Sequence, residues 1–189
     1  FENGTSRVAS YLFADCTGLE SIEIPEGVTS IDGNAFYNCR QLKRVTLPST
    51  VTKLDSYSFE KCVSLTQITL PNGITSIEWG AFRDCTNLKE IVIPDSVVTI
   101  NDSAFSRCTN LSSVKLSKNL KEIGGEAFYN CDALTSIEIP KSLEKGGYYD
   151  GGVFADCDNL KTVTFENGTS RVASYLFADC TGLESIEIP

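Results

Sequence analysis

The sequence predicts a right-handed α/β solenoid in which each coil contributes one short parallel strand and one short helical segment. Three observations lead to this fold class. The eight cysteines follow one another at intervals of 23, 23, 23, 23, 23, 26 and 23 residues. A phenylalanine stands three residues before every cysteine, and a leucine stands three residues after it. Self-similarity at such a period is typical of solenoids, whose repeats bury their apolar faces only against their neighbours.

The segment around each cysteine has the apolar spacing of a helix. In the second coil, Ala35, Phe36, Cys39 and Leu42 recur every three to four positions. This spacing places apolar side chains on one side of a 3.6-residue turn. It predicts one or two turns of helix in every coil.

The segment that follows has the spacing of a strand. Ile22 and Ile24 alternate with polar residues, and equivalent pairs follow in the other coils. A proline follows this pair in six coils, where a residue without an N–H ends the ladder and turns the chain. These prolines are Pro25, Pro48, Pro71, Pro94, Pro140 and Pro189.

Stacking turns each column of equivalent residues into a ladder along the solenoid axis. A coil of 23 residues cannot enclose a core, so neighbouring coils must cover its apolar side chains. The largest side chain common to all coils is the phenylalanine before the cysteine. We therefore expect the phenylalanine column to form the centre of the core.

Composition excludes several functions. With 16 Lys and Arg against 25 Asp and Glu, the net charge is −9, which argues against nucleic acid or an anionic membrane as partner. The chain has no histidine, which removes His-based catalysis and most zinc sites. No apolar run reaches the length of about 18 residues needed to span a membrane. The sequence predicts a non-enzymatic protein without cofactor or metal, and no membrane insertion in this segment.

The cysteines are expected to be buried free thiols. Stacked equivalent residues lie about 4.8 Å apart with parallel Cα–Cβ bonds, whereas a disulfide needs Cβ atoms about 3.8 Å apart and turned toward each other. A buried thiol acts as a small apolar group. Metal binding is the weaker alternative, because no Cys-x-x-Cys pair is present.

The repeat Leu-x-x-Ile-x-Ile-Pro-x-x-Val-x-x-Ile, followed by Ala-Phe-x-x-Cys, resembles the BspA-like class of leucine-rich repeats over the whole chain. The resemblance implies a leucine-rich repeat right-handed superhelix. It further implies a secreted or cell-surface protein, because several members of that class act as adhesins for host matrix proteins or other cells. No individual binding residue is implied, since the class has no fixed site motif.

A longer repeat is superimposed on the short one. Residues 1–25 are identical to residues 165–189, an offset of 164 that equals six steps of 23 and one of 26. We interpret residues 1–189 as a single solenoid of about eight coils, with 1–164 as one long unit and 165–189 as the start of an identical next unit. The identity of the two segments indicates a recent duplication or a deliberate design.

Two groups of residues are candidates for binding a partner. The first lies on the solvent side of the predicted strands: Arg44, Gln67, Glu90 and Lys115. In leucine-rich repeats this side commonly binds proteins, although a merely solvated surface is the simpler interpretation. The second is the three-residue insertion of the 26-residue coil, which holds Tyr148, Tyr149 and Asp150. It suits a sugar or a protein, or it is a flexible excursion.

Two functions remain open. The first is an extracellular or cell-surface protein whose repeat surface binds a protein or glycan on a cell or matrix. The alternative is a structural stalk or filament of tandem 164-residue units, with possible end-to-end self-association. Variable, aromatic-bearing surfaces favour the first, and the recurrence of residues 1–25 favours the second.

Overall fold

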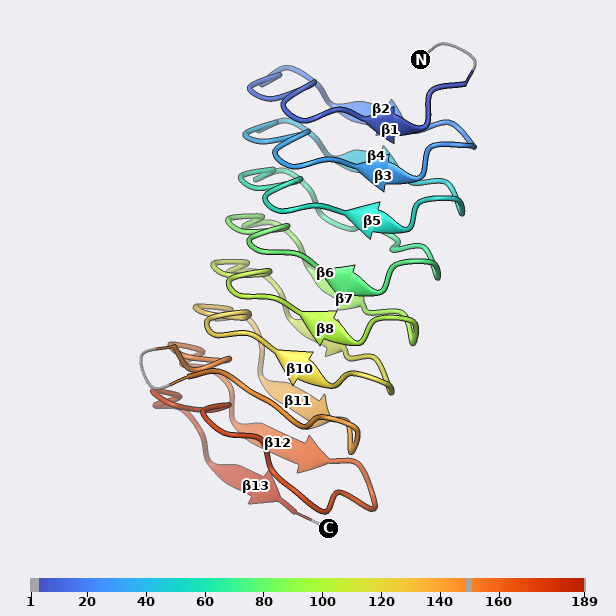
Figure 1. Cartoon of the computed structure of the whole chain (residues 1–189). Helices are drawn as coiled ribbons and strands as arrows, with labels where there is room; N and C mark the ends of the chain where they lie inside the picture. Colours follow the sequence, from blue (N-terminus) through green and yellow to red (C-terminus); the bar gives the residue numbers. More distant parts are fainter. Residues whose placement is uncertain (1–3, 149–150, 189) are drawn as a thin grey trace.

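The computed structural model describes residues 4–148 and 151–188, which form a parallel β-solenoid of about eight turns (Figure 1). Each turn adds one layer along the long axis, and the coils follow each other from the N-terminal to the C-terminal end. All strand pairs are parallel and join equivalent positions of successive coils. The short repeat of the sequence is therefore the structural repeat.

Most coils contain two short strands, where the sequence predicted one. The first strand follows the leucine that recurs in every coil and forms what we call the sheet face: β2 (Ser21–Glu23), β4 (Arg44–Thr46), β7 (Glu90–Val92), β9 (Ser113–Lys115), β11 (Ser136–Ile139), β12 (Thr162–Phe165) and β13 (Ser185–Glu187). The second strand follows the Pro-x-x-Val turn and forms the opposite sheet: β1 (Arg7–Val8), β3 (Ser30–Ile31), β5 (Lys53–Leu54), β6 (Ser76–Ile77), β8 (Thr99–Ile100) and β10 (Glu122–Ile123).

The predicted helical segment is wrong, because no helix forms in the described part of the chain. Consecutive tight turns replace the helix and place the apolar side chains on the same side at the same spacing of three to four residues. The N–H of Cys39 donates to the carbonyl of Phe36 three residues earlier (3.2 Å), as in a turn. The N–H of Phe36 instead donates to the carbonyl of Ser58 in the next coil (2.8 Å). Because alternate N–H groups bond to the neighbouring coil, an i→i−4 helical ladder cannot form.

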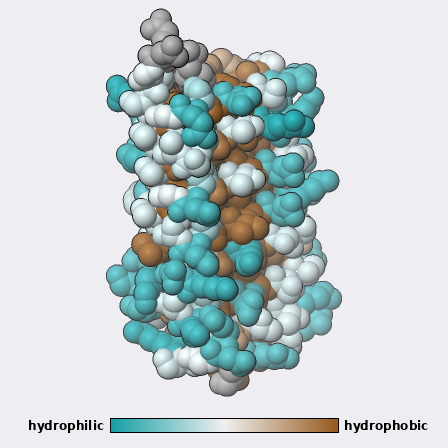
Figure 2. Space-filling model, turned by 90° about the vertical axis from the view of Figure 1, so that its right-hand side faces the viewer, coloured by the Kyte–Doolittle hydropathy of each residue, from teal (hydrophilic) through white to brown (hydrophobic). Residues whose placement is uncertain are grey.

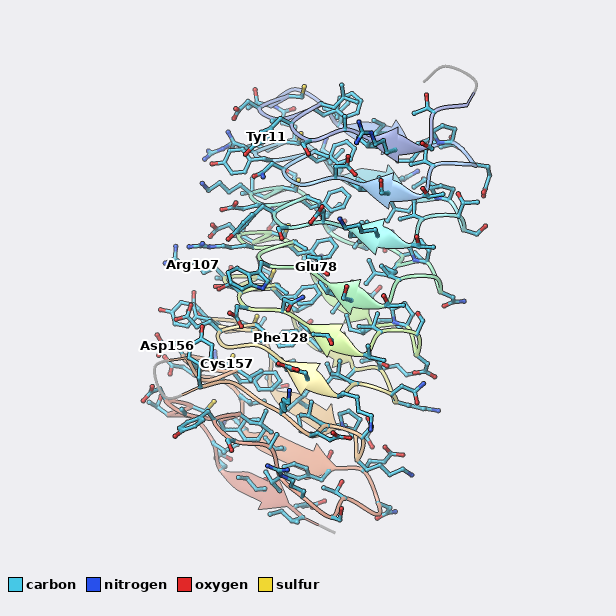
Figure 3. The ribbon with its side chains drawn as sticks, viewed as in Figure 1. Tyr11, Glu78, Arg107, Phe128, Asp156 and Cys157 are labelled. Atoms are coloured by element: carbon cyan, nitrogen blue, oxygen red, sulfur yellow. The ribbon has the colours of Figure 1, made fainter. Side chains whose placement is uncertain are left out.

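Left-handed residues enforce these turns. Asn34 and Asn38, two positions before and after Phe36, have φ of +58°. The same two positions are left-handed in most other coils, including Arg107 with φ of +61° (labelled in Figure 3). Left-handed backbone costs a residue with a Cβ roughly 1–2 kcal/mol and interrupts a right-handed helix.

Arg107 offers a test of this turn geometry. We expect Arg107→Gly to raise the free energy of unfolding by up to about 1 kcal/mol, because glycine adopts positive φ without a steric cost. Arg107→Val should lower it by about 1–2 kcal/mol, because a β-branched side chain is strained there. Urea unfolding of both variants measures the difference. Equal stability of the two variants would contradict the left-handed turn.

The predicted phenylalanine column is confirmed. Each ring stacks on the equivalent ring of the next coil, with centroids 5.1 to 5.5 Å apart and planes within 14° of parallel. Phe128, labelled in Figure 3, is fully buried in this column. The leucines that recur in every coil, and the isoleucines and valines of both strands, pack around it in one continuous core.

The sides of the solenoid differ in character. Figure 2 shows the side on which the chain turns between the two sheets, where apolar residues run along the long axis between hydrophilic ones. The prolines after the first strand turn the chain on this side, and Pro48, Pro71, Pro94 and Pro140 are buried. Ion pairs between successive coils lie on the surface, such as Lys43 with Glu20 (3.1 Å) and Lys121 with Glu144 (2.7 Å). Exposed pairs of this kind contribute little to stability.

Candidate functional site

The sheet face displays one row of variable side chains per strand position. In β4 and β7, the burial alternates so that Arg44, Thr46, Glu90 and Val92 are exposed, while the residues between them are buried. Parallel pairing in register aligns equivalent residues, as Val92 with Lys115. The predicted solvent-facing column therefore exists, and its composition changes from coil to coil.

A groove opens where this sheet is interrupted. The sheet face consists of separate pieces, β2–β4, β7–β9 and β11–β12–β13. Within the described residues no strand forms at 67–70, so the third coil bridges β4 and β7 without ladder pairing. The N–H of Ile24 donates to Thr46 (3.0 Å) and that of Ile93 to Lys115 (2.8 Å), but the equivalent bonds from Leu47 and Leu70 do not form among the described residues.

Three of the predicted candidates meet in this groove. Arg44 and Glu90 lie on its two flanks, and Gln67 lies between them on the interrupted segment. Further lining residues are Thr46, Leu47, Thr69, Asn72, Val92 and Pro94. The groove combines a guanidinium, a carboxylate, two amides and an exposed valine. Such a surface can form hydrogen bonds and ion pairs.

Lys115 belongs to a second, neighbouring groove. This groove lies beside the break between β9 and β11, and Lys118, Glu138, Pro140 and Glu166 also line it. The backbone N–H of Lys141 donates to the carboxylate of Glu166 (3.2 Å), and the Lys141 ammonium lies 3.3 Å away. These contacts, the backbone hydrogen bond first, lower the pKa of Glu166. The groove therefore presents two lysines and two carboxylates.

The insertion candidates lie apart from both grooves. Tyr148 is exposed, its ring packs against Gly125 of the preceding coil, and its backbone exchanges hydrogen bonds with Gly151 (3.0 and 3.3 Å). It lines neither groove. Tyr149 and Asp150 lie outside the described residues. The structure thus brings Arg44, Gln67 and Glu90 together, and it separates Tyr148 from them.

Some lining residues were not foreseen. Asn72 and Pro94 come from turns after the first strand, and Lys118 and Glu166 occupy the equivalent turns of later coils. Asn72 precedes Gly73 in a Pro-Asn-Gly turn, which is a typical turn signal. That signal marks the turn but not its proximity to the sheet face. The position of the grooves depends on where the ladder breaks, which no column of the repeat encodes.

The buried cysteines of the column have low reactivity. All eight cysteines are free thiols, and those of the six inner coils are buried. Each inner thiol donates to the phenylalanine carbonyl of the preceding coil, as Cys157 does to Phe128 (3.1 Å; both labelled in Figure 3). Burial raises the pKa of Cys39 to about 11 and that of Cys85 well above its ordinary value. Because the thiolate is the reactive form, these sulfurs are poor nucleophiles.

Cys16 and Cys180 depart from the predicted burial. Cys16 is exposed and Cys180 is partly buried, because each belongs to a terminal coil that is covered on one side only. Among the described residues, no three His, Cys, Asp or Glu side chains are grouped so that they could hold a metal ion. Nor does a helix long and apolar enough to cross a membrane occur in that part of the chain.

A sequence model of the family described as "BspA type Leucine rich repeat region (6 copies)" matches residues 1–108 and 75–189. A search of curated proteins found no match. The chain is thus covered by one family description from end to end.

Solved structures with the same architecture come from several bacteria. A leucine-rich repeat protein from Bacteroides ovatus ATCC 8483 is 28% identical with a TM-score of 0.66, over 95% of this chain and 58% of that one. A leucine rich cell surface protein from Faecalibacterium prausnitzii A2-165 is 27% identical, with a TM-score of 0.57, over 94% and 62%. The T. pallidum leucine rich repeat protein is 28% identical, with a TM-score of 0.61, over 94% and 71%. The chain therefore spans about three fifths of the first two proteins.

Proposed function

The chain belongs to the family of BspA-type leucine-rich repeats, and from this premise we propose that it is a non-enzymatic binding protein that holds an extended segment of a partner protein in the groove of Arg44, Gln67 and Glu90. The observation that carries the proposal is the break in the sheet at residues 67–70, beside which this groove lies.

The break changes the backbone hydrogen bonding of the third coil. Among the described residues, the N–H groups of residues 67–70 donate to no backbone carbonyl. Extended peptides bind strand-like segments through main-chain hydrogen bonds, and side-chain pockets add specificity. Residues 67–70 lie between the coils of β4 and β7, so a partner segment would lie across the open face of the groove and contact the exposed side chains of Gln67 and Thr69.

The side chains around the break favour a protein ligand over a glycan. Arginine is enriched in interface hot spots, and Arg44 stands on one flank opposite the carboxylate of Glu90. Val92 is 59% exposed and offers an apolar contact. Among the described residues that line this groove there is no aromatic ring, and a sugar ring binds by stacking on such a flat apolar surface.

We place this binding function outside the cell. One similar structure is a leucine rich cell surface protein, and the match covers 94% of the present chain. An adhesive surface for proteins of a matrix or of a neighbouring cell agrees with that location. The tyrosines of the insertion, Tyr148 and Tyr149, remain the candidate for a glycan.

Charge reversal at Arg44 tests the groove. We expect Arg44→Glu to weaken binding of the chain to its matrix partner at least about tenfold, the equivalent of losing about 1.4 kcal/mol at a hot spot. The measurement is surface plasmon resonance against purified collagen, fibronectin and laminin, with mucin as the glycan probe.

Arg107→Glu is the matched control, because it makes the same charge change on the turns and outside the groove. It should bind as the wild type does. If Arg44→Glu bound normally and Tyr148→Ala did not, the ligand would sit on the insertion and the groove proposal would be wrong.

A second candidate function is a structural array of covalently joined 164-residue units. The identity of residues 1–25 and 165–189 favours it, because the same coil then begins each unit. Seven coils at a strand spacing of about 4.8 Å give a unit rise of about 34 Å. Electron microscopy of a chain of several such units should show rods with this repeat; isolated short arcs would count against the array.

A further inference from the structure

Two exposed aromatic side chains lie outside both grooves, on the turns that follow the second strand of a coil. Trp79 and Tyr148 are each 52% exposed, and neither lines a groove. Both belong to inner coils, because backbone hydrogen bonds join each of their coils to the coil before it and to the coil after it. Single exposed apolar side chains are ordinary, whereas several gathered on one surface indicate an interaction site.

Trp79 stands in a row of equivalent residues that runs along the solenoid axis. Trp79, Asp102 and Gly125 each lie three positions before the phenylalanine of their coil. The N–H of Gly80 donates to the carbonyl of Asp102 (3.1 Å), and the N–H of Ser103 donates to the carbonyl of Gly125 (3.0 Å). These bonds join three successive coils, so the row advances by about 4.8 Å at each step.

Gly125 carries no side chain, and the ring of Tyr148 occupies that space. A Cβ on Gly125 would lie 2.6 Å from two ring carbons of Tyr148 and 2.9 Å from its hydroxyl oxygen. The ring of Tyr57 lies in the same way against Gly80, which directly follows Trp79, and a Cβ there would be 2.5 Å from two of its ring carbons. Each glycine therefore accommodates an aromatic ring from a neighbouring coil. We call Tyr57, Trp79, Asp102 and Tyr148 the aromatic platform.

The carboxylate of Asp102 lies between Trp79 and the place of the Tyr148 ring. Its Oδ1 accepts the N–H of Gly125 (2.9 Å), which holds the carboxylate on the platform. Within the described parts of the chain, this carboxylate forms no ion pair and no second hydrogen bond. An ionised carboxylate has about four acceptor sites, so Asp102 can accept further hydrogen bonds from a ligand.

We propose that the aromatic platform is a second binding site, and that its ligand is an uncharged oligosaccharide. Sugar rings present apolar C–H faces that stack on aromatic rings, and hydroxyl groups that donate to a carboxylate. Trp79 and the place of the Tyr148 ring are two steps apart in the row, about 10 Å along the axis. One sugar ring cannot span that length, so the ligand has several sugar rings.

Charge selects an uncharged glycan over an acidic one. Asp102 lies in the middle of the platform, and two further carboxylates belong to the same turns: Glu78, labelled in Figure 3, directly precedes Trp79, and Glu126 directly follows Gly125. The net charge of the chain is −9. A uronic or sialic acid would therefore meet carboxylates and an overall negative field, which oppose its binding.

Trp79 is the only tryptophan of the chain, so its fluorescence reports directly on the platform. The neutral probes are cellohexaose, chitohexaose, maltohexaose and mannohexaose, and hexagalacturonic acid is the acidic probe. Each is titrated into the whole chain of 189 residues. We expect at least one neutral probe to shift the Trp79 emission saturably and to protect it from quenching by acrylamide. No change with any neutral probe, or tighter binding of the acidic probe, would overturn the proposal.

Variants that keep Trp79 test the rest of the platform. Tyr148→Ala should raise the Kd of the bound probe at least about fivefold, because one stacking ring is lost. Gly125→Ala should also raise it, because the added Cβ displaces the Tyr148 ring without removing it. An unchanged Kd in both variants, with folding confirmed by circular dichroism, would contradict the platform.

Tyr37→Ala is the matched control, because it removes a tyrosine outside the platform, one that lies against the Lys61 ammonium (4.9 Å from the ring centroid). It should bind the probe as the wild type does, and an equal loss there would overturn the proposal. Arg44→Glu should also leave sugar binding unchanged. The glycan site and the partner-binding groove can thus fail independently of each other.

Discussion

Replacing Phe82 with alanine should lower the free energy of unfolding by about 3–5 kcal/mol. Phe82 is fully buried, and its ring stacks on Phe59 (5.5 Å between centroids) and on Phe105 (5.3 Å). The substitution removes the whole ring from the middle of the column, where the solenoid cannot close the cavity without moving two coils. Urea unfolding, with the midpoint and the slope both measured, gives the value.

Phe177→Ala is the matched control for this prediction. Phe177 lies in the C-terminal coil, is only partly buried and stacks on Phe154 (5.5 Å). We expect it to cost clearly less than Phe82→Ala, because part of its surface is already in contact with water. An unchanged midpoint for Phe82→Ala would show that the column is not the centre of the core.

Alkaline pH is expected to destabilise the protein steeply. Burial raises the pKa of Cys62, Cys85 and Cys131 well above the ordinary value of 9.0 in the folded chain. Above about pH 9 the unfolded chain releases protons that the folded chain keeps, so the free energy of unfolding falls as the pH rises. Each such thiol contributes a slope of about 1.4 kcal/mol per pH unit. The stabilisation is therefore complete below pH 9 and decreases above it.

Urea unfolding at a series of pH values between neutrality and pH 10.5 measures this slope. Cys85→Ala should reduce the slope by about 1.4 kcal/mol per pH unit, because it removes one thiol that stays protonated in the folded chain. A slope that is the same in wild type and Cys85→Ala would mean that the buried thiols do not govern the alkaline transition.

The repeat, the core and the family could be predicted from the sequence, because every coil of a solenoid places the same residue types at equivalent positions. Phe36, Cys39 and Leu42 recur in register, and stacking then fixes which side chains meet. The outward position of Arg44 and Glu90 followed from strand alternation in the same way. Periodicity alone was sufficient for both.

The local backbone could not be read with the same certainty. An apolar spacing of three to four residues fits a helix, but it also fits successive turns. In these turns one N–H bonds within the coil, as Cys39 does to the carbonyl of Phe36, and another bonds to the next coil, as Phe36 does to the carbonyl of Ser58. The choice depends on left-handed residues such as Asn38, and several residue types occupy that position here. The break at residues 67–70 likewise depends on how two neighbouring coils pack, which a single column does not record.

The alternation of hydrogen bonds within and between coils has a mechanical consequence. A force applied along the axis meets the weakest resistance at a terminal coil, which one neighbour holds instead of two. When a coil of 23 residues is peeled away, it can extend to about 80 Å of chain, while the stacked column shortens by only about 4.8 Å. The molecule is therefore expected to lengthen in discrete steps under tension, one coil at a time, while the remaining column stays intact.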